Sequence, residues 1–271
     1  MRHTYECPMR WADMDLLGHV NNVTYLEYVA EARLDMFGGD GAGRARVARH
    51  RVQFVAPLVF HRHPVRVDSW VSCTTDDEVT LEHEVYDLTE DDGGGELRKV
   101  YVRATTVLAH RLDAAELEVV DRHRGAAQEW RDARGPARPP RASWPLRLRR
   151  SDVDERGEAS DVAHFEFFQE ARIQYVMNLH TRGQKWSQHV VASTDIEYHA
   201  PVPPRAEPYA VRSWVGSLGN RSFTIESELC DGDQVLATAA VVMVAFDMDT
   251  QRPTEMADTQ RARLGRELAA D

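Results

Sequence analysis

The chain has 271 residues, enough for about two domains at roughly 150 residues each. Lysine and arginine number 33 and aspartate and glutamate 44, so the net charge is −11, which argues against binding to nucleic acid through bulk charge. Hydrophobic residues make up 42% and charged residues 28% of the chain, a composition typical of folded proteins that excludes a largely disordered one.

Targeting and redox features predict a cytoplasmic protein. No run approaches the roughly 18 apolar residues of a membrane span, and charged residues occupy the N-terminal stretch where a signal peptide needs an apolar one. Cys7, Cys73 and Cys230 are odd in number and lack C-x-x-C spacing, so we expect reduced cysteines that pack inside the fold. We therefore expect neither a membrane nor a nucleic acid as partner.

An internal repeat divides the chain, and such repeats are weighed before single motifs. The pattern R-x-x-D-x-D-x-x-G occupies residues 10–18 and again residues 149–157. Further matches follow in the same order in both halves. They are E-A-R at 31–33 and 170–172, A-P at 56–57 and 200–201, and S-W-V at 69–71 and 213–215.

The repeat predicts the domain boundaries. We expect a first domain at residues 1–112 and a second at residues 145–252. A linker at residues 113–144 contains G-P-A-R-P-P, which cannot continue regular structure. A C-terminal surface helix is expected over residues 253–271, because a proline is followed there by good helix formers.

The residue pattern of each half predicts one strand, one long helix and then four strands. Apolar residues at helical spacing predict buried stripes on the two helices; these are Val23, Leu26, Ala30, Leu34 and Phe37, and then Phe165, Phe168, Ala171, Tyr175 and Leu179. The later strands are expected at 49–55, 65–73, 79–86 and 99–109, and at 193–199, 209–215, 222–229 and 235–246. This order favours a mostly antiparallel sheet with a helix on one face and excludes a Rossmann arrangement.

The D-x-D-x-x-G motif is the first candidate site. Asp13 and Asp15 lie two residues apart at the expected end of a strand, and Gly18 permits a turn before the helix begins near Asn22. A carboxylate held beside a helix N-terminus adjoins N–H groups and a positive dipole end, which can stabilise an oxyanion. The alternative interpretation is that the two aspartates only shape a turn.

Residues next to the motif differ between the halves. Asn21, Asn22, Ser160 and Asp161 are good N-cap types, and capping is the expected role. His19 matches Glu158, so the two sites cannot be chemically equivalent. His19 itself either contacts substrate or packs in the fold.

Two further groups have a structural and a functional interpretation. Glu31, like Glu170, is followed two residues later by an arginine, so it either forms an ion pair or a solvated face or supplies a second carboxylate that holds water or substrate. His61 and His63 form an H-x-H pair that could chelate a metal on a strand face. No third ligand is evident, and we expect no metal site.

Residues 11–22, W-A-D-M-D-L-L-G-H-V-N-N, followed by Tyr25, Tyr28 and E-A-R, resemble the 4-hydroxybenzoyl-CoA thioesterase-like family of hotdog-fold acyl-CoA thioesterases. The resemblance covers most of residues 1–112 and is less specific in the second half. It implies an α+β tandem hotdog fold, each half a long helix wrapped by a curved antiparallel sheet. The halves would pack as an intramolecular pseudo-dimer, and further homo-oligomers are left open.

The resemblance also implies hydrolysis of an acyl-CoA thioester to the free acid and the CoA thiol, with no metal and no cofactor other than the CoA of the substrate. The family's catalytic aspartate maps onto Asp15 and, in the second half, onto Asp154, acting as nucleophile or general base. Backbone N–H groups after Gly18 would polarise the carbonyl. The full set of expected site residues is Asp15, Asp154 and Glu31 for catalysis and Gly18, His19, Asn22 and Tyr25 for substrate binding.

The second half departs from this pattern. Glu158 and Asp161 add negative charge where an oxyanion would develop, so we expect the Asp15 site to be the more active one. Two alternative functions remain, a non-catalytic acyl-CoA binding protein and a hydratase that uses Asp15 with His19. Release of free thiol separates a thioesterase from both, and the net charge slightly favours CoA over an acidic acyl carrier protein.

Overall fold

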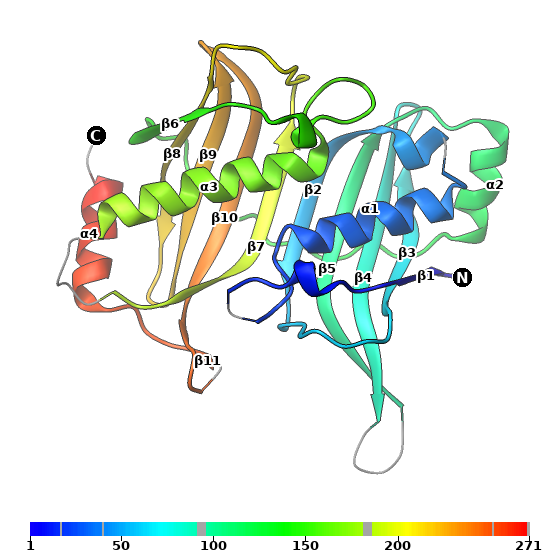
Figure 1. Cartoon of the computed structure of the whole chain (residues 1–271), viewed down its shortest axis with the longest axis horizontal. Coiled ribbons are helices and arrows are strands. Elements are labelled where there is room, and N and C mark those ends of the chain that lie inside the picture. Colours follow the sequence, from blue (N-terminus) through cyan, green and yellow to red (C-terminus); the bar gives the residue numbers. More distant parts are fainter. Residues whose placement is uncertain (17, 40, 91–95, 181–185, 251, 270–271) are drawn as a thin grey trace. The chain divides into compact units, whose positions relative to one another are not determined.

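A computed structural model of the chain describes residues 1–16, 18–39, 41–90, 96–180, 186–250 and 252–269. The chain divides into two compact units, Met1–Trp130 and Arg131–Asp271. Each unit is a long helix packed on an antiparallel sheet (Figure 1), which confirms the predicted α+β hotdog fold in both halves. Within the described residues, no helix has the length and apolar character that crossing a membrane requires. The pairing of the two halves as a pseudo-dimer stays a prediction.

The first unit begins with the strand that precedes the motif. Its elements in chain order are β1 (His3–Cys7), η1 (Trp11–Asp13), α1 (Thr24–Met36), η2 (Gly41–Arg44), β2 (Arg46–Phe54), β3 (Val65–Thr74), β4 (Glu78–Glu90), β5 (Glu96–Ala109) and α2 (Ala114–Arg122). The strands pair antiparallel in the order β1-β3-β4-β5-β2.

The second unit repeats this topology. Its elements are β6 (Ala142–Leu146), η3 (Arg150–Asp152), α3 (Asp161–Leu179), β7 (His189–Tyr198), β8 (Tyr209–Leu218), β9 (Ser222–Asp231), β10 (Gln234–Asp247), β11 (Arg252–Pro253) and α4 (Asp258–Ala269). The strands pair antiparallel in the order β6-β8-β9-β10-β7, with β11 beside β10. Position by position this is the strand order of the first unit, so the sequence repeat is also a structural repeat.

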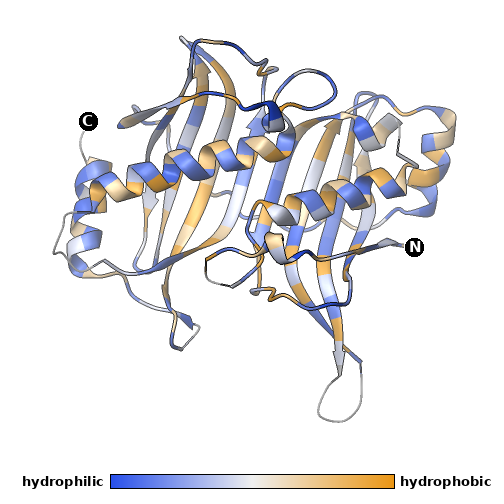
Figure 2. Cartoon of the chain, viewed as in Figure 1, coloured by the Kyte–Doolittle hydropathy of each residue, from blue (hydrophilic) through white to orange (hydrophobic). Residues whose placement is uncertain are grey.

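The two long helices, which both carry apolar and polar residues in alternation (Figure 2), differ in how well their buried residues agree with the predicted stripes. On α3 all five predicted positions are buried. On α1, Leu26 is buried as predicted but Ala30 and Leu34 are only half-buried. Val29, Ala32 and Met36 take their place, so the buried face of α1 is turned relative to the predicted one.

The segment predicted as a linker is structured. Asp113 caps α2 by accepting a hydrogen bond of 2.8 Å from the Glu116 N–H, and Glu116 accepts one of 2.7 Å from the Asp113 N–H. Beyond α2, the Gln128 side chain donates to the carbonyl of His83, and Trp130 donates to Thr105. Residues 114–130 therefore pack on the first unit, and the boundary between the units lies between residues 130 and 131.

The C-terminal helix α4 begins at Asp258 and not at Pro253, which lies in β11. The expected last residues of this helix, Ala270 and Asp271, lie outside the described residues. Leu264 is completely buried against β8 and the core of the second unit. The helix is thus a packed part of that unit as well as part of its surface.

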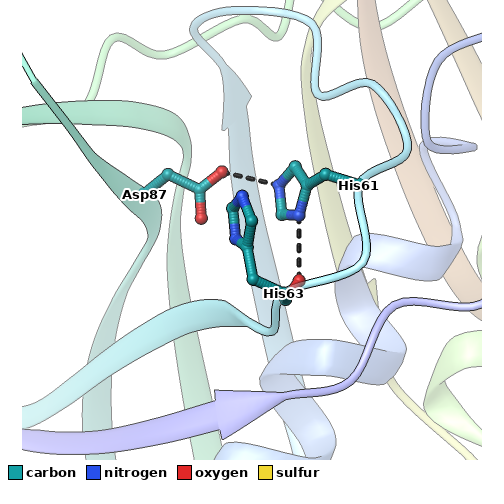
Figure 3. A group of neighbouring side chains, drawn as sticks. All are labelled: His61, His63 and Asp87. Atoms are coloured by element: carbon teal, nitrogen blue, oxygen red, sulfur yellow. Dashed lines mark hydrogen bonds and ion pairs between the residues drawn. The ribbon is translucent and has the colours of Figure 1, made fainter.

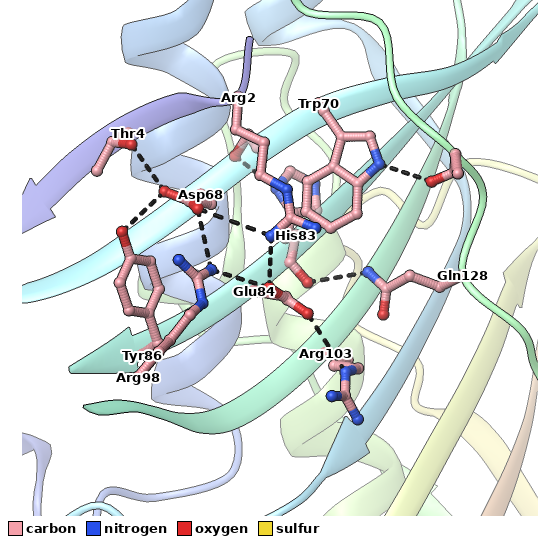
Figure 4. Close-up of polar contacts among 12 residues, drawn as sticks. Arg2, Thr4, Asp68, Trp70, His83, Glu84, Tyr86, Arg98, Arg103 and Gln128 are labelled. Atoms are coloured by element: carbon pink, nitrogen blue, oxygen red, sulfur yellow. Dashed lines mark hydrogen bonds and ion pairs between the residues drawn. The ribbon is translucent and has the colours of Figure 1, made fainter. Parts of the chain in front are cut away.

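A network of charged side chains links the strands of the first sheet (Figure 4). Arg98 lies 2.9 Å from Asp68 and 2.8 Å from Glu84, and Arg2 lies 2.5 Å from Glu84. Tyr86 donates a hydrogen bond of 3.0 Å to Asp68. Burial acts to raise the pKa of Glu84, but the two arginines outweigh burial and lower it. The network joins residues from β3, β4 and β5 to the N-terminus of the chain.

Candidate active site

The D-x-D-x-x-G segment forms a closed turn in front of α1. The Asp15 N–H donates to the His19 carbonyl at 2.7 Å, and the Gly18 N–H donates to the Asp15 carbonyl at 3.1 Å. Gly18 has φ = +75°, a conformation that glycine adopts without strain. The prediction that the aspartates lie at the end of a strand is wrong, because β1 ends at Cys7 and Asp13 closes the short helix η1.

Asp13 connects this turn to α1. Asp13 is buried, with 8% of its surface exposed. Its carboxylate accepts hydrogen bonds of 2.5 Å from the Tyr28 hydroxyl and 2.6 Å from the Arg10 N–H. Its carbonyl accepts a hydrogen bond of 2.8 Å from the Asn21 N–H. Asp13 thus holds the two ends of the turn together, and its carboxylate faces the interior of the unit.

Asp15 is half-buried, and its carboxylate contacts the backbone of the turn itself. Its Oδ1 atom accepts a hydrogen bond of 3.2 Å from the His19 N–H. Tyr25, in the first turn of α1, accepts a hydrogen bond of 3.2 Å from the Leu58 N–H. Burial, with smaller contributions from Tyr101 and Asp15, raises the pKa of Tyr25 well above its usual range. A protonated hydroxyl that accepts one hydrogen bond can still donate another, so Tyr25 is a potential donor that interacts electrostatically with the Asp15 carboxylate.

The first three backbone N–H groups after Gly18 already have hydrogen-bond acceptors within the chain. His19 donates to Asp15, Val20 donates to the Leu58 carbonyl at 2.8 Å, and Asn21 donates to Asp13. These three groups therefore do not form an oxyanion site in this conformation.

Capping differs between the two halves. Ser160 caps α3 as predicted, because its hydroxyl accepts a hydrogen bond of 3.0 Å from the Ala163 N–H. The N-cap of α1 is Val23, which has no capping side chain. Asn21 instead accepts a hydrogen bond of 3.0 Å from the Val23 N–H, and Asn22 lies half-buried in the turn before the helix.

The remaining predicted residues of the first half are separated. His19 is half-buried, and its backbone pairs with Val59 in an isolated bridge. Glu31 is exposed on α1, and its electrostatic contacts are with Tyr5 and Cys7 on β1. Within the described part of the chain, no contact joins Glu31 to Asp15.

Exposed apolar side chains flank the turn. Trp11 and Leu16 are largely exposed, as is Val59, whose backbone pairs with His19. The Trp11 ring packs edge-on against Phe60 at 5.4 Å. Exposed apolar groups thus lie beside the Asp15 turn, although the sequence alone does not indicate that Leu58 and Val59 reach it.

In the second half an arginine occupies the matching turn. Arg156 lies 2.5 Å from the Asp154 carboxylate and 3.2 Å from that of Glu158. Arg156 therefore offsets the extra negative charge that the sequence predicts. The residue at the matching position of the first half is Leu17, which lies outside the described residues but carries no charge. Comparing the two halves at this position would have identified Arg156 from the sequence.

The second half also lacks the tyrosine hydroxyls of α1. Phe167 stands where the first half has Tyr28, and His164 stands where it has Tyr25. His164 is buried, its Nδ1 lies 2.7 Å from the Ser160 carbonyl, and burial lowers its pKa. With the proton on Nδ1, the Nε2 atom of His164 is an acceptor and cannot polarise a carbonyl.

Comparison with known proteins places this geometry in context. The sequence matches the family described as the thioesterase-like superfamily over residues 9–128 and 148–264, which include both turns. A search of curated proteins finds no significant match.

Solved structures share the fold over nearly the whole chain. A Lactobacillus plantarum protein, ascribed oleoyl thioesterase activity, is 10% identical with a TM-score of 0.68, covering 91% of this chain and 97% of its own. An acyl-ACP thioesterase from Bacteroides thetaiotaomicron is 12% identical, with a TM-score of 0.62 and coverage of 89% and 97%. The 12:0-ACP thioesterase from Umbellularia californica is 15% identical, with a TM-score of 0.60 and coverage of 94% and 97%. At these identities the likeness shows the fold alone.

Proposed function

The chain belongs to the thioesterase-like superfamily, and from this premise we propose that it hydrolyses acyl-CoA thioesters at the turn that holds Asp15. The observation that carries the proposal is the electrostatic interaction between the Asp15 carboxylate and the buried Tyr25. A thioester hydrolase needs a group that attacks or activates water and a donor for the carbonyl oxygen. Asp15 and Tyr25 supply these two groups.

In the proposed reaction the Tyr25 hydroxyl donates a hydrogen bond to the thioester carbonyl oxygen. Asp15 either takes a proton from a water molecule that attacks the carbonyl carbon or attacks that carbon itself. The new C–O bond forms, the C–S bond breaks, and the departing CoA thiolate takes up a proton. In the second route, water then hydrolyses the acyl–aspartate anhydride. No electrons are transferred, so the reaction needs no redox cofactor.

Glu31 is left out of this proposal because it is exposed and faces β1. The apolar side chains of Trp11, Leu16 and Val59 support an acyl substrate, since they offer apolar surface at the turn. The net charge of −11 supports CoA over an acidic carrier protein. Because two of the similar structures are acyl-ACP thioesterases, acyl-ACP belongs in the test.

The test measures thiol release from short, medium, long and aromatic acyl-CoAs and from acyl-ACP. We expect Asp15→Asn to lower kcat/KM by about 100-fold or more, the usual scale for loss of a catalytic acid or base. Asp154→Asn is the matched control, because Arg156 already pairs with that carboxylate, and we expect a change of less than about threefold.

Three outcomes would contradict the proposal. Acyl-CoA binding without thiol release would identify the binding protein considered as an alternative. Hydration of an enoyl-CoA without thiol release would favour a hydratase. Loss of turnover in Asp154→Asn with retention in Asp15→Asn would move the reaction to the second half.

A further inference from the structure

A cluster of two histidines and an aspartate lies in the first unit, apart from the carboxylate of Asp15. His61 and His63 belong to the loop between β2 and β3, and Asp87 is on β4 (Figure 3). The potential ligand atoms of the three side chains all lie within 4.8 Å of one another. The sequence predicted that the H-x-H pair lies on a strand face, but it lies in a loop. Asp87 is the third potential ligand, which the sequence did not reveal.

Strand pairing explains why Asp87 reaches the loop. The antiparallel pairing of β3 with β4 places Tyr86 opposite Arg66, next to the first residue of β3. Asp87 is one residue further along β4, beside the point where the loop enters β3. Twenty-odd residues of sequence separate these side chains, but the register of one strand pair brings them together.

The hydrogen bonds around His61 direct one ring nitrogen toward Asp87. Its Nδ1 atom lies 2.9 Å from the His63 carbonyl oxygen, which can only accept a hydrogen bond. This Nδ1 therefore carries a hydrogen. Nε2 faces the Asp87 carboxylate at 2.7 Å and gives up its own hydrogen when it binds a metal. Histidines that bind metals commonly donate their other ring N–H to a backbone carbonyl in this manner.

The other two side chains complete an arrangement suited to a metal. Asp87 is buried, with 4% exposure, and is held by a hydrogen bond of 3.1 Å from the Tyr101 hydroxyl. His63 is exposed, and its ring stacks on that of His61 with centroids 3.6 Å apart. Two ligands are therefore held in place by the fold, while the third is on the solvent side and can adjust.

We propose that His61, His63 and Asp87 bind a divalent zinc ion through two imidazole nitrogens and one carboxylate oxygen. This donor set suits zinc, whereas magnesium and calcium prefer oxygen ligands. Metal–ligand distances near 2.1 Å require ligand atoms roughly 3.4 Å apart. Zinc binding therefore needs the His61 and Asp87 atoms, now 2.7 Å apart, to separate slightly and the exposed His63 ring to adjust. Water completes the coordination.

The ion would connect the β2–β3 loop to β4. The same loop contains Leu58 and Val59, whose backbones pair with Val20 and His19. Zinc would therefore stabilise the segment that lies against the Asp15 turn. The proposal does not depend on the reaction that occurs there.

Zinc binding is tested by calorimetric titration of the chelator-treated full chain with zinc chloride, with magnesium chloride as a second probe. We expect one zinc per chain and no magnesium binding. His63→Ala changes an exposed side chain, so the fold should persist, and we expect zinc affinity to fall at least about tenfold. Asp87→Asn should have the same effect. Zinc should also raise the Tm of the native chain but not of these variants.

His3→Ala is the matched control, because His3 pairs with the carboxylate of Asp35 at 2.9 Å without belonging to a three-ligand group among the described residues. Retained zinc binding in this variant supports the proposal. Three results would overturn it: no zinc binding, binding that survives both His63→Ala and Asp87→Asn, or binding lost only in Cys73→Ser, which removes an exposed thiol.

Discussion

The Tyr28 hydroxyl donates a hydrogen bond of 2.5 Å to Oδ2 of Asp13, and this contact connects the D-x-D-x-x-G turn to α1. Both groups are buried. Burial, together with Asp13, raises the pKa of Tyr28 well above its usual range, so the hydroxyl keeps its proton and remains the donor. In the second half Phe167 occupies the matching position, and Asp152 has no tyrosine to pair with there.

Replacement of Tyr28 by phenylalanine is expected to destabilise the first unit. Hydrogen bonds to charged groups contribute about 1.5–3 kcal/mol, and the variant leaves a buried carboxylate with one donor fewer. Urea unfolding followed by a probe in residues 1–130 should show this loss. Tyr175→Phe, followed by a probe in the second unit, is the control, because its bond to Glu267 is longer, at 3.3 Å. Equal losses in the two variants would contradict a special role for the Asp13 contact.

Replacement of Tyr25 by phenylalanine tests the carbonyl donor. Removing one donor of this kind typically lowers kcat by roughly 100-fold or more, and we expect KM to change little. The variant also leaves the Leu58 N–H without its acceptor, so its Tm must be measured beside its kinetics. Tyr5→Phe, on β1, is the control. A variant that stays folded and keeps its native kcat would show that Tyr25 is not the donor.

The Arg156 contact leads to a prediction about the second half. Arg156→Leu copies the residue found at Leu17 and removes both ion pairs of the arginine. Because Arg156 is about one-third exposed, at 34%, the free energy of unfolding should change by less than about 1 kcal/mol. Combined with Asp15→Asn, it should not restore thiol release, because His164 lacks the hydroxyl of Tyr25. Restored turnover would contradict this explanation of the asymmetry.

The sequence predicted the fold well because the helix and strand periodicities are local signals, and the repeat presents them in both halves. The stripe on α3 is right at every position, whereas α1 is rotated. Periodicity defines how often a helix returns to the core but not which face it buries. On α1 that choice follows from polar partners: Tyr28 reaches Asp13, and Arg33 donates to the Gly43 carbonyl at 3.1 Å. These contacts orient the helix toward polar partners, which a pattern of apolar residues does not reveal.

The candidate site was predictable only where its parts are close in sequence. Asp15, Gly18 and Tyr25 lie within one short segment; the first two form one turn, and Tyr25 follows in the first turn of α1. The hydrogen bonds donated by the His19 and Val20 N–H groups were not predictable. The first depends on the orientation of the Asp15 side chain, and the second on Leu58 in a distant loop. The capping box of α2, D-x-x-E at residues 113–116, was readable in the sequence, and it indicates a helix inside the predicted linker.

An acid-sensitive contact holds α4 to the second unit. The Gln260 side chain is completely buried, and its oxygen accepts a hydrogen bond of 3.1 Å from the Ser187 N–H. Its amide nitrogen must then donate to Nε2 of His189, at 2.5 Å, which requires an unprotonated ring nitrogen. Burial lowers the pKa of His189 from 6.5 to about 4.

This shift predicts how stability depends on pH. Between pH 6.5 and about 4 the unfolded chain binds a proton at His189 that the folded chain does not. The stabilising contribution is therefore complete above pH 6.5 and is lost as the pH falls through this window, at up to about 1.4 kcal/mol per pH unit. His189→Gln retains an acceptor for Gln260 but does not titrate, so the free energy of unfolding of the second unit should fall less steeply with acid. His199→Gln, at an exposed position just beyond β7, is the control and should keep the native slope. A native slope in His189→Gln would show that this contact does not govern the acid sensitivity of α4.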